Sequence, residues 1–305
     1  MTTFSRRAAA LADVPALGDL ERAAEVSWWG RPETEDADVR HGLEWVGDLG
    51  SRTLVLVDPA GALVGFAAVG GQGEGSLLVA PSLDPGARTG AGDALVVWLA
   101  GAGARTLGAP RQDTERLALL RGHGFTPARS SFDLELAAGE PLPHPDWPDG
   151  VTLRAFDADR DAPELHALVY SVWTDVPGHT ARPFDEWRLL MLGHDGFDPA
   201  LQVLAVRDGR LVGAAVCRTY GGTDGWVSQL VVGRDARRIG LGRTVLVEAL
   251  RRLAAVPGTE LVGLSVYAAN TQALGLYRSV GLRIDREFVI CQREPAGGEP
   301  ASRSG

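Results

Sequence analysis

The sequence predicts a mixed α/β protein made of two tandem domains, each a twisted mixed β-sheet flanked by helices. The first observation behind this prediction is an internal repeat: residues 54–65 (LVLVDPAGALVG) align with residues 202–213 (QVLAVRDGRLVG), and residues 113–125 align with residues 270–282. The second is that strand-like and helix-like apolar patterns alternate in the same order within both copies. One α/β unit that occurs twice explains both observations.

The elements of the second copy follow from its residue patterns in chain order. Strands are expected at the short apolar runs 153–156, 203–206, 211–217, 226–232, 261–267 and 286–291. Asp208-Gly209 is a typical hairpin turn between two of them. Helices are expected at residues 163–173, along the apolar stripe 245–253, and between Asn270, which can act as an N-cap, and Gly281. The last strand is expected to close the sheet of its own copy.

A proline-rich stretch separates the two copies. Residues 137–150 contain four prolines, which can continue neither a helix nor a central strand, so an extended linker is expected at residues 138–150. The domains are then residues 1–137 and 151–294. The polar tail, residues 295–305, is expected to be disordered.

The composition excludes several classes of protein. The chain has 305 residues, a formal net charge of −9 and 45% apolar residues, which is typical of a globular protein and unfavourable for binding nucleic acid. No apolar run approaches the roughly 18 residues of a membrane span. Cys217 and Cys291 are too few for a disulfide framework or a zinc cluster, so we expect no metal and a cytoplasmic location. The chain contains no lysine, which excludes a Walker A lysine and a pyridoxal Schiff base.

The most informative segment is residues 230–243 (LVVGRDARRIGLGR), where an apolar strand enters a turn rich in arginine and glycine and a helix follows. Such a turn directs several backbone N–H groups at one point beside a helix N-terminus, which suits a phosphate or pyrophosphate. The alternative is a tight turn that leads into a helix with a solvated basic face. Because the chain as a whole is acidic, the local excess of arginine favours a phosphorylated ligand.

The pattern R-x-x-G-x-G at residues 237–242, directly after the strand at residues 226–232, resembles the acyl-CoA-binding motif of the GNAT superfamily of N-acetyltransferases. Asn270 and Tyr277 follow at the distance that this superfamily shows, and the order of elements in residues 151–291 fits its fold. The tandem arrangement is similar to that of two-domain actinobacterial members. The resemblance implies transfer of an acetyl group from acetyl-CoA to an amine of a small molecule or peptide. We expect a monomer or a homodimer.

The resemblance also implies roles for single residues. Tyr277 would protonate the departing CoA thiolate as general acid; alternatively, it is a core residue whose hydroxyl needs a partner. Asn270 would contact the pantetheine arm, or it only caps its helix. Backbone amides of the turn would hold the pyrophosphate, and the preceding strand would bind pantetheine and polarise the thioester carbonyl. The residues implied in acetyl-CoA binding are Leu230, Val231, Val232, Arg237, Arg238, Gly240, Gly242, Arg243 and Asn270.

The general base is not evident from the sequence. Family members often place a glutamate on the strand before the glycine turn, but here Gln229 stands in that region and cannot take a proton. Gln229 is therefore a candidate for acceptor contact only. Asp175 and His179 lie in the loop region that GNAT proteins use for their acceptors, and either is a candidate base. Asp224 and Glu287 are alternatives that would act through a water molecule.

The first copy has lost the residues that carry the chemistry. At the positions of the motif arginine, the asparagine and the tyrosine it has Ala87, Asp113 and Leu120. We therefore expect residues 1–137 to be a degenerate, non-catalytic domain with an altered turn at residues 87–92. The decayed copy and the missing strand glutamate also motivate an alternative function for the protein, which is to bind or sense acyl-CoA without catalysis.

Overall fold

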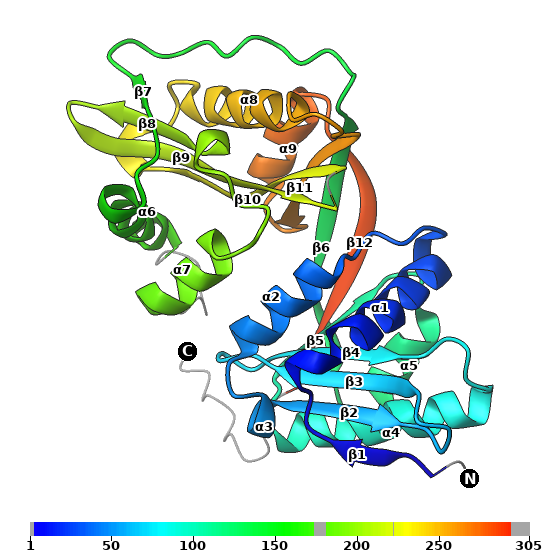
Figure 1. The fold of residues 1–305 in the computed structure, drawn as a ribbon. Coiled ribbons are helices and arrows are strands. Elements are labelled where there is room, and N and C mark those ends of the chain that lie inside the picture. The colour runs from blue at the N-terminus through cyan, green and yellow to red at the C-terminus, as the bar shows by residue number, and fades with distance from the viewer. Residues whose placement is uncertain (1–2, 174–180, 222, 294–305) are drawn as a thin grey trace, which may run out of the picture. The chain divides into compact units, whose positions relative to one another are not determined.

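The computed structural model describes residues 3–173, 181–221 and 223–293 (Figure 1). The described residues form two compact units: unit 2 is Phe132–Arg286, and unit 1 consists of the residues before and after that range. Each unit has a mixed sheet with helices on both faces, which confirms the predicted mixed α/β class. The tail and the candidate residues Asp175 and His179 lie outside the described residues.

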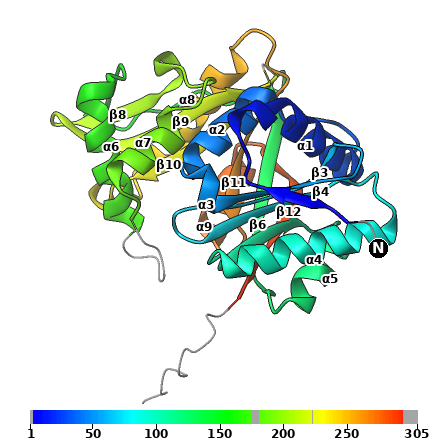
Figure 2. The same cartoon turned by 60° about the horizontal axis from the view of Figure 1, so that its bottom comes forward.

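In unit 1 the strand order is β1-β2-β3-β4-β5-β12. β4 and β5 are parallel, and the other neighbours are antiparallel. In two views, α4 and α5 lie on one face of the sheet and α1 and α2 on the other (Figures 1 and 2). The elements are β1 (Ser5–Arg7), α1 (Val14–Trp29), α2 (Asp36–Val46), α3 (Leu49–Arg52), β2 (Thr53–Val57), β3 (Leu63–Val69), β4 (Glu74–Val79), α4 (Pro85–Gly101), β5 (Thr106–Pro110), α5 (Thr114–Gly122) and the end of β12 (Arg283–Gln292).

In unit 2 the strand order is β6-β11-β10-β9-β8-β7. β10 and β11 are parallel, whereas the strands from β7 to β10 pair antiparallel. The buried residues of α8 and α9 form one core, and those of α6 and α7 form another. The elements are β6 (Thr126–Ala137), β7 (Thr152–Arg154), α6 (Ala158–Trp173), α7 (Phe184–Leu192), β8 (Val203–Arg207), β9 (Arg210–Tyr220), β10 (Asp224–Val232), α8 (Leu241–Ala254), β11 (Leu261–Tyr267) and α9 (Thr271–Ser279).

Local sequence patterns predicted most elements of unit 2, although α7 was not among them. Asp208 and Gly209 both adopt left-handed backbone, with φ of 52° and 76°, which is the conformation that a two-residue hairpin turn between β8 and β9 requires. α8 buries the predicted apolar stripe, including Val245, Leu250 and Leu253. These are short-range effects, since the turn and the stripe each depend on neighbouring residues.

The last strand of each sequence repeat lies in the sheet of the other repeat. The prediction that β12 closes the sheet of its own copy is wrong, because Phe288 pairs with Pro110 and Gln292 with Thr106 of β5. In unit 2, β6 takes the place beside β11, and Ser265 Oγ donates a hydrogen bond of 2.6 Å to Asp133 Oδ1. Alternating apolar residues predict a strand but not its partner, and two copies of one fold offer equivalent sheet edges.

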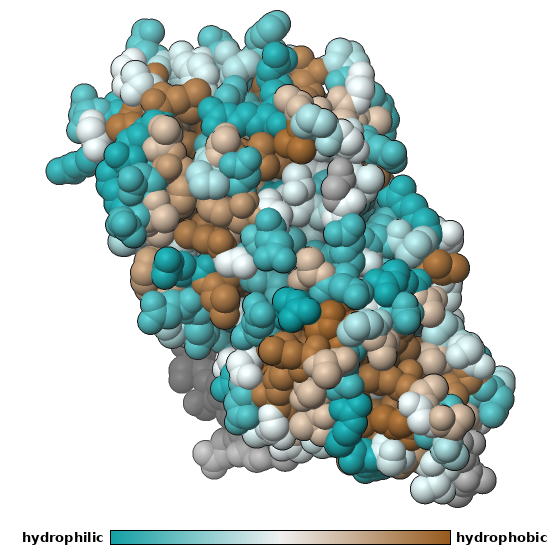
Figure 3. Space-filling view, in the orientation of Figure 1, coloured by the Kyte–Doolittle hydropathy of each residue, from teal (hydrophilic) through white to brown (hydrophobic). Residues whose placement is uncertain are grey.

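Apolar side chains are not fully covered on one side of unit 1. Figure 3 shows apolar side chains gathered on this face of unit 1. Of its sheet residues, Val57 on β2 and Leu63 and Phe66 on β3 are only partly buried. The same residues pack against the buried core between α1, α2 and the sheet. No described helix combines the length and the apolar character needed to cross a membrane.

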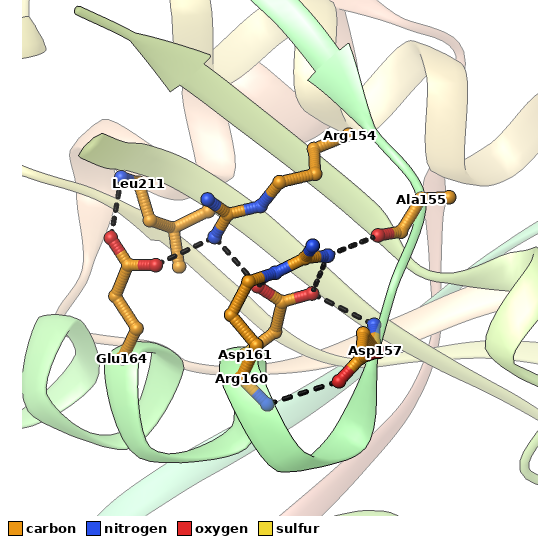
Figure 4. A network of polar contacts seen from close by, with 7 residues as sticks. All are labelled: Arg154, Ala155, Asp157, Arg160, Asp161, Glu164 and Leu211. Carbon is orange, nitrogen blue, oxygen red and sulfur yellow. Dashed lines mark hydrogen bonds and ion pairs between the residues drawn. The ribbon is translucent and has the colours of Figure 1, made fainter. Parts of the chain in front are cut away.

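A network of ionic side chains joins β7, α6 and β9 in unit 2 (Figure 4). The Nη2 atom of Arg154 lies 2.6 Å from Asp161 Oδ1 and also 2.6 Å from Glu164 Oε2. Asp161 is fully buried and also accepts hydrogen bonds from the Asp157 N–H and the Arg160 side chain. Glu164 Oε1 accepts from the Leu211 N–H at 2.8 Å. The network therefore fixes the start of α6 against the strands.

Residues 138–150, between the two repeats, contain neither helix nor strand. Leu142 and Trp147 of this segment pack against the core of unit 2. Thr244 Oγ1 of α8 donates a hydrogen bond to the Asp146 carbonyl. The segment is thus bound along unit 2 close to the start of α8.

Candidate active site

The edge of β10 is unpaired on one side beyond Val227. β10 pairs with β11 only from Asp224 to Val227, whereas its pairing with β9 continues to Val232. The β9 register shifts between Val227 and Gln229, so Ser228 forms a bulge. Among the described residues, the main chain of residues 229–232 has no strand partner on the β11 side. An extended ligand can add to such an edge through main-chain hydrogen bonds, as another strand would.

The turn that follows β10 presents free amides. Arg238 and Gly240 adopt left-handed backbone, with φ of 65° and 85°, and Gly240 is the N-cap of α8 with no side-chain cap. Within the described part of the chain, the N–H groups of Arg238, Ile239, Gly240, Leu241 and Gly242 donate to no acceptor. Unpaired N–H groups at a helix N-terminus form an anion site, because the helix dipole adds positive potential there.

Buried anchors hold both ends of this turn. The Gly233 N–H donates to the Val212 carbonyl at 2.9 Å. Ala236 and Leu241 are each only 1% exposed and belong to the core beneath the turn. Arg207 Nη2 donates to the Asp235 carbonyl at 3.1 Å. Arg238, Ile239 and Gly240 are exposed, Gly242 is partly exposed and Leu241 is buried, so the turn itself lies at the surface above this core.

Arginines surround the turn and link it to α9. Arg237, Arg238 and Arg243 are all exposed. Arg243 Nη1 donates to the Ser279 Oγ at 2.6 Å and to the Ser279 carbonyl at 3.2 Å, near the end of α9. Arg237 Nε makes a long contact of 3.4 Å with the Val232 carbonyl. The basic charge is therefore concentrated where the unpaired amides lie.

The end of β10, the start of α8 and the middle of α9 meet at Gly242. A Cβ atom at this position would lie 3.6 Å from Val232 Cγ2 and 3.8 Å from Leu276 Cδ2, which are ordinary contact distances. Leu276 directly precedes Tyr277. The structure thus brings the predicted strand, turn and tyrosine-bearing helix together around one residue.

Tyr277 combines a packed ring with a free hydroxyl. The ring is 8% exposed and belongs to the main core of unit 2. Its hydroxyl forms no hydrogen bond with any described residue, yet it is not among the fully enclosed polar atoms. Burial raises the pKa of the Tyr277 phenol above its ordinary value. The side chain is therefore neutral at physiological pH and has a proton to donate.

Asn270 acts as a helix cap in the structure. Its Oδ1 accepts a hydrogen bond of 3.1 Å from the Ala273 N–H at the start of α9. The residue is exposed, and the cap engages only the oxygen of its side-chain amide. Its NH2 group has no partner among the described residues and is available to a ligand.

Three of the candidate base and acceptor residues lie among the described residues, Gln229 and Asp224 in unit 2 and Glu287 in unit 1. Gln229 Oε1 accepts a hydrogen bond of 3.1 Å from Trp187 Nε1, so its amide is held against α7. Glu287 lies in unit 1, where Arg111 and Ser130 bind its carboxylate. The hydrogen bond from Arg111 is the main reason that the pKa of Glu287 is lowered. Asp224 stands at the start of β10, at the opposite end of the strand from the turn.

Three residues beside β10 were not predicted from the sequence. Arg218 of β9 is 5% exposed, and its Nε donates to Ser228 Oγ at 2.7 Å, at the bulge. Its Nη2 donates to the Leu190 carbonyl of α7 at 3.2 Å. Trp187, fully buried, holds Gln229. The signal for Arg218 is a lone charge at the end of an apolar strand; nothing in the sequence marks the contacts of Trp187 or Ser228.

The corresponding segment of unit 1 is helical. Residues 87–92, expected to form an altered turn, lie inside α4. α4 starts at Pro85, with Asp84 as N-cap, and Asp84 Oδ1 accepts from the Ala87 N–H at 2.9 Å. The glycines that survive in this copy therefore do not indicate a surviving turn, because Pro85 and Asp84 begin a helix ahead of them.

Comparison with known proteins matches residues 162–282 to the "Acetyltransferase (GNAT) family". A mycothiol acetyltransferase of Thermobispora bispora is 32% identical over 293 residues, which cover 88% of this chain and 92% of that protein. The crystal structure of a GCN5-related N-acetyltransferase from Sphaerobacter thermophilus has a TM-score of 0.74 at 27% identity and covers 95% of both chains. A tandem GNAT protein from the clavulanic acid biosynthesis pathway shares the fold, with a TM-score of 0.70 at 17% identity. This match covers 97% of this chain and 100% of that protein.

Proposed function

This chain belongs to the GNAT family of acetyltransferases, and we propose that its unit 2 transfers the acetyl group of acetyl-CoA to an amine by direct attack. One observation carries the proposal: the unpaired edge of β10 at residues 229–232 leads directly into the five free amides of the turn. An extended amide-bearing arm that ends in a pyrophosphate matches this sequence of main-chain donors and acceptors.

Binding would be divided among the residues around Gly242. The free amides and the arginines of the turn would hold the pyrophosphate, and the absence of a side chain at Gly242 lets it approach the backbone. Main-chain groups of residues 230–232 would pair with the pantetheine arm and polarise the thioester carbonyl, which stabilises the developing oxyanion. The NH2 group of Asn270 would contact the same arm.

The chemical step needs only positioning and a proton donor. The amine nitrogen attacks the thioester carbon, so a C–N bond forms and the C–S bond breaks. Tyr277 would give its phenolic proton to the departing thiolate, and the surplus proton of the amine would leave to water. Tyr277 is suited to this task because its hydroxyl is neutral, is not fully enclosed, and has no hydrogen-bond partner among the described residues.

The relatives suggest the acceptor. The Thermobispora bispora protein is named a mycothiol acetyltransferase, and we infer that this chain acts in the same chemistry, on the amine of desacetylated mycothiol. Incubation of the purified chain with acetyl-CoA and this amine should release one free CoA thiol for each acetylated product. Absence of any acetyl-CoA binding would refute the proposal as a whole.

The second candidate function is acyl-CoA binding without catalysis. It is favoured by the lack of a carboxylate base at Gln229, whose side chain is engaged by Trp187. Binding of acetyl-CoA without transfer to a broad panel of amines would support it. Transfer to any amine of the panel at a rate that depends on Tyr277 would rule it out.

The substitution Gly242→Ala should separate binding from folding. The new methyl group would meet Val232 and Leu276 only at ordinary contact distances of 3.6 and 3.8 Å, and alanine in a helix is more stable than glycine by about 0.5–1 kcal/mol. It would, however, occupy the space in which a phosphate approaches the amide. We expect acetyl-CoA affinity to fall about 10- to 100-fold, because a hydrogen bond to a charged group contributes about 1.5–3 kcal/mol, with no loss of thermal stability.

The matched control for this variant is Gly90→Ala in α4 of unit 1, where a new Cβ meets no described atom within 4 Å. In isothermal titration calorimetry, the Gly90→Ala control should bind acetyl-CoA with the same affinity as the unsubstituted protein. Equal affinities for the two variants would contradict the assignment of the pyrophosphate to the unit 2 turn.

The pH dependence of turnover should reflect the protonated phenol. A general acid with a raised pKa keeps its proton below that pKa and loses it as the pH rises through it. Since the pKa of Tyr277 lies above the ordinary phenol value of 10.0, kcat with saturating substrates should show no alkaline decrease before pH 10.0. A decrease centred near neutral pH, absent from Tyr277→Phe, would be incompatible with this expectation.

A further inference from the structure

Unit 1 contains a cavity of about 840 Å³ at the position that corresponds to the candidate site of unit 2. Its wall includes Gly92 and Asp113, which align with Gly242 and Asn270. Its apolar wall comes from α1, β4 and α5 and includes Ala24, Trp28, Leu77, Val79 and Leu119. Its ionisable side chains are Arg88, Asp93, Asp113, Glu115, Arg116 and His123. A cavity with a mixed wall of this kind suits a small ligand with one polar end.

The cavity lacks the amide turn that a diphosphate needs. In unit 2 the helix begins at Leu241, whereas α4 begins at Pro85, well ahead of the aligned Ala91. Pro85 has no N–H, the Ala87 N–H donates to Asp84 Oδ1, and the Arg88 N–H donates to the Asp84 carbonyl. The Asp84 carboxylate at this helix N-terminus would also repel a phosphate. A CoA-type ligand therefore loses its main anchor in unit 1.

Each carboxylate in the cavity wall already has a partner. Asp93 Oδ1 lies 2.7 Å from His123 Nε2. Asp113 accepts hydrogen bonds from Trp28 Nε1 at 3.0 Å and from the Arg116 N–H at 2.9 Å. Glu115 lies 3.4 Å from Arg88 Nη1. The acidic groups of the wall are thus satisfied within unit 1.

The Arg116 guanidinium, in contrast, has no hydrogen bond and no ion pair with any described residue. Its Nε is enclosed, and its Cζ lies 5.7 Å from the centre of the Trp28 ring. Burial lowers the pKa of Arg116 to about 10, against the attraction of Asp113 and Glu21, so it remains charged at neutral pH. Burial also raises the pKa of Glu21 to about 7, so Glu21 compensates this charge only in part. An unpaired cation in a cavity wall calls for an anionic partner.

We propose that this cavity binds a small carboxylic acid as its carboxylate, paired with Arg116, with the apolar body of the acid against Trp28 and Leu119. A guanidinium binds a planar carboxylate through two parallel hydrogen bonds. A monoanion is favoured over a phosphate monoester, because three carboxylates already line the wall and would repel a second negative charge. Leu120, at the position of Tyr277, carries no proton donor, so the site binds its ligand without catalysis.

Titration calorimetry on the full chain with acetate, hexanoate, benzoate and phenylacetate tests this proposal. We expect the larger acids to bind one per chain and to raise the melting temperature. Arg116→Gln should weaken this binding about 10- to 100-fold. It should not lower the melting temperature of the free protein, because it removes an unpaired charge. Arg121→Gln, an exposed arginine of α5 outside the cavity wall, is the matched control and should bind like the unsubstituted chain.

The carboxylate site does not depend on the activity proposed for unit 2. Acetyl-CoA titrated into the same samples should bind once per chain, and Arg116→Gln should leave that affinity unchanged. Failure to bind acetyl-CoA at all would refute the function proposed for unit 2 alone. Failure of every acid to bind at millimolar concentration, or equal binding by Arg116→Gln, would overturn the carboxylate site. Two acetyl-CoA molecules per chain, one of them displaced by phenylacetate, would also overturn it.

Discussion

Replacement of Tyr277 by phenylalanine is expected to lower kcat by about 10²–10⁴-fold, the usual contribution of a positioned proton donor. The substitution removes only the hydroxyl, which has no partner among the described residues, and keeps the ring that the core of unit 2 surrounds. Without the phenol the CoA thiolate has to leave unprotonated. The measurement is steady-state release of free thiol at saturating acetyl-CoA and amine.

Two further measurements on Tyr277→Phe distinguish a catalytic from a packing role. If the hydroxyl acts only in the chemical step, acetyl-CoA affinity and melting temperature should stay close to those of the unsubstituted chain. If Tyr277 is a core residue and nothing more, kcat should be unchanged as well, and the phenylalanine variant would be fully active. That outcome would remove Tyr277 from the mechanism and leave acetyl-CoA binding by the turn intact.

The substitution Asp161→Asn is expected to destabilise unit 2 by about 3–5 kcal/mol, the usual cost of removing one partner of a buried ion pair. Asp161 is fully buried, and its carboxylate accepts from Arg154, Arg160 and the Asp157 N–H. Asparagine keeps the shape but replaces one acceptor oxygen by a donor that faces these donors. Urea unfolding of the unsubstituted chain and of Asp161→Asn, followed by circular dichroism, measures the loss.

The internal repeat supplies the matched control, Asp13→Asn. Asp13 aligns with Asp161 and lies 2.6 Å from Arg7 Nη1, but the Arg7 side chain is 48% exposed. An exposed pair of this kind contributes about 1 kcal/mol or less, so the control should unfold at nearly the same urea concentration as the unsubstituted chain. If Asp161→Asn and Asp13→Asn lost the same unfolding free energy, burial would not explain the contribution of the network to stability.

The same carboxylate should make unit 2 sensitive to acid. Burial by itself raises the pKa of Asp161, but the hydrogen bonds from Arg160 and Asp157 and the charge of Arg154 outweigh it, and the net pKa is lowered from 3.8. A lowered pKa contributes stability above the ordinary value, and this stability is lost as the pH falls through the folded value. The difference in stability between the unsubstituted chain and Asp161→Asn should therefore shrink below about pH 4.

Part of the candidate site could be predicted from residue types and spacing. The strand at residues 226–232, the glycine at position 240 and the cap at Asn270 each express preferences of a few neighbouring residues, and the structure has all three. The alignment of the two copies, however, suggested a turn at residues 87–92 where α4 lies. The stronger local signals there are Asp84 and Pro85, which start a helix before the glycines are reached.

Other parts of the site depend on contacts that spacing does not specify. The parting of β10 from β11 after Val227 results from pairing between strands about forty residues apart. The hydroxyl of Tyr277 and the guanidinium of Arg116 are of interest because neither has a hydrogen-bond partner among the described residues. A sequence names the groups that can pair, but only the packed chain shows which of them remain unpaired.

The order of residues is enough to establish a tandem repeat of one α/β unit, a glycine-arginine turn after a strand in the second copy, and the lack of the matching arginine and tyrosine in the first. It does not show that β6 and β12 each join the sheet of the other repeat, or that the first copy holds a cavity with a charged Arg116 and no amide turn; these features appear only in the folded chain. The difference lies in the distance along the chain over which each effect acts. Backbone propensities and caps act over a few residues along the chain, whereas strand partners, burial and unpaired charges are set by residues that are far apart in sequence and meet only on folding.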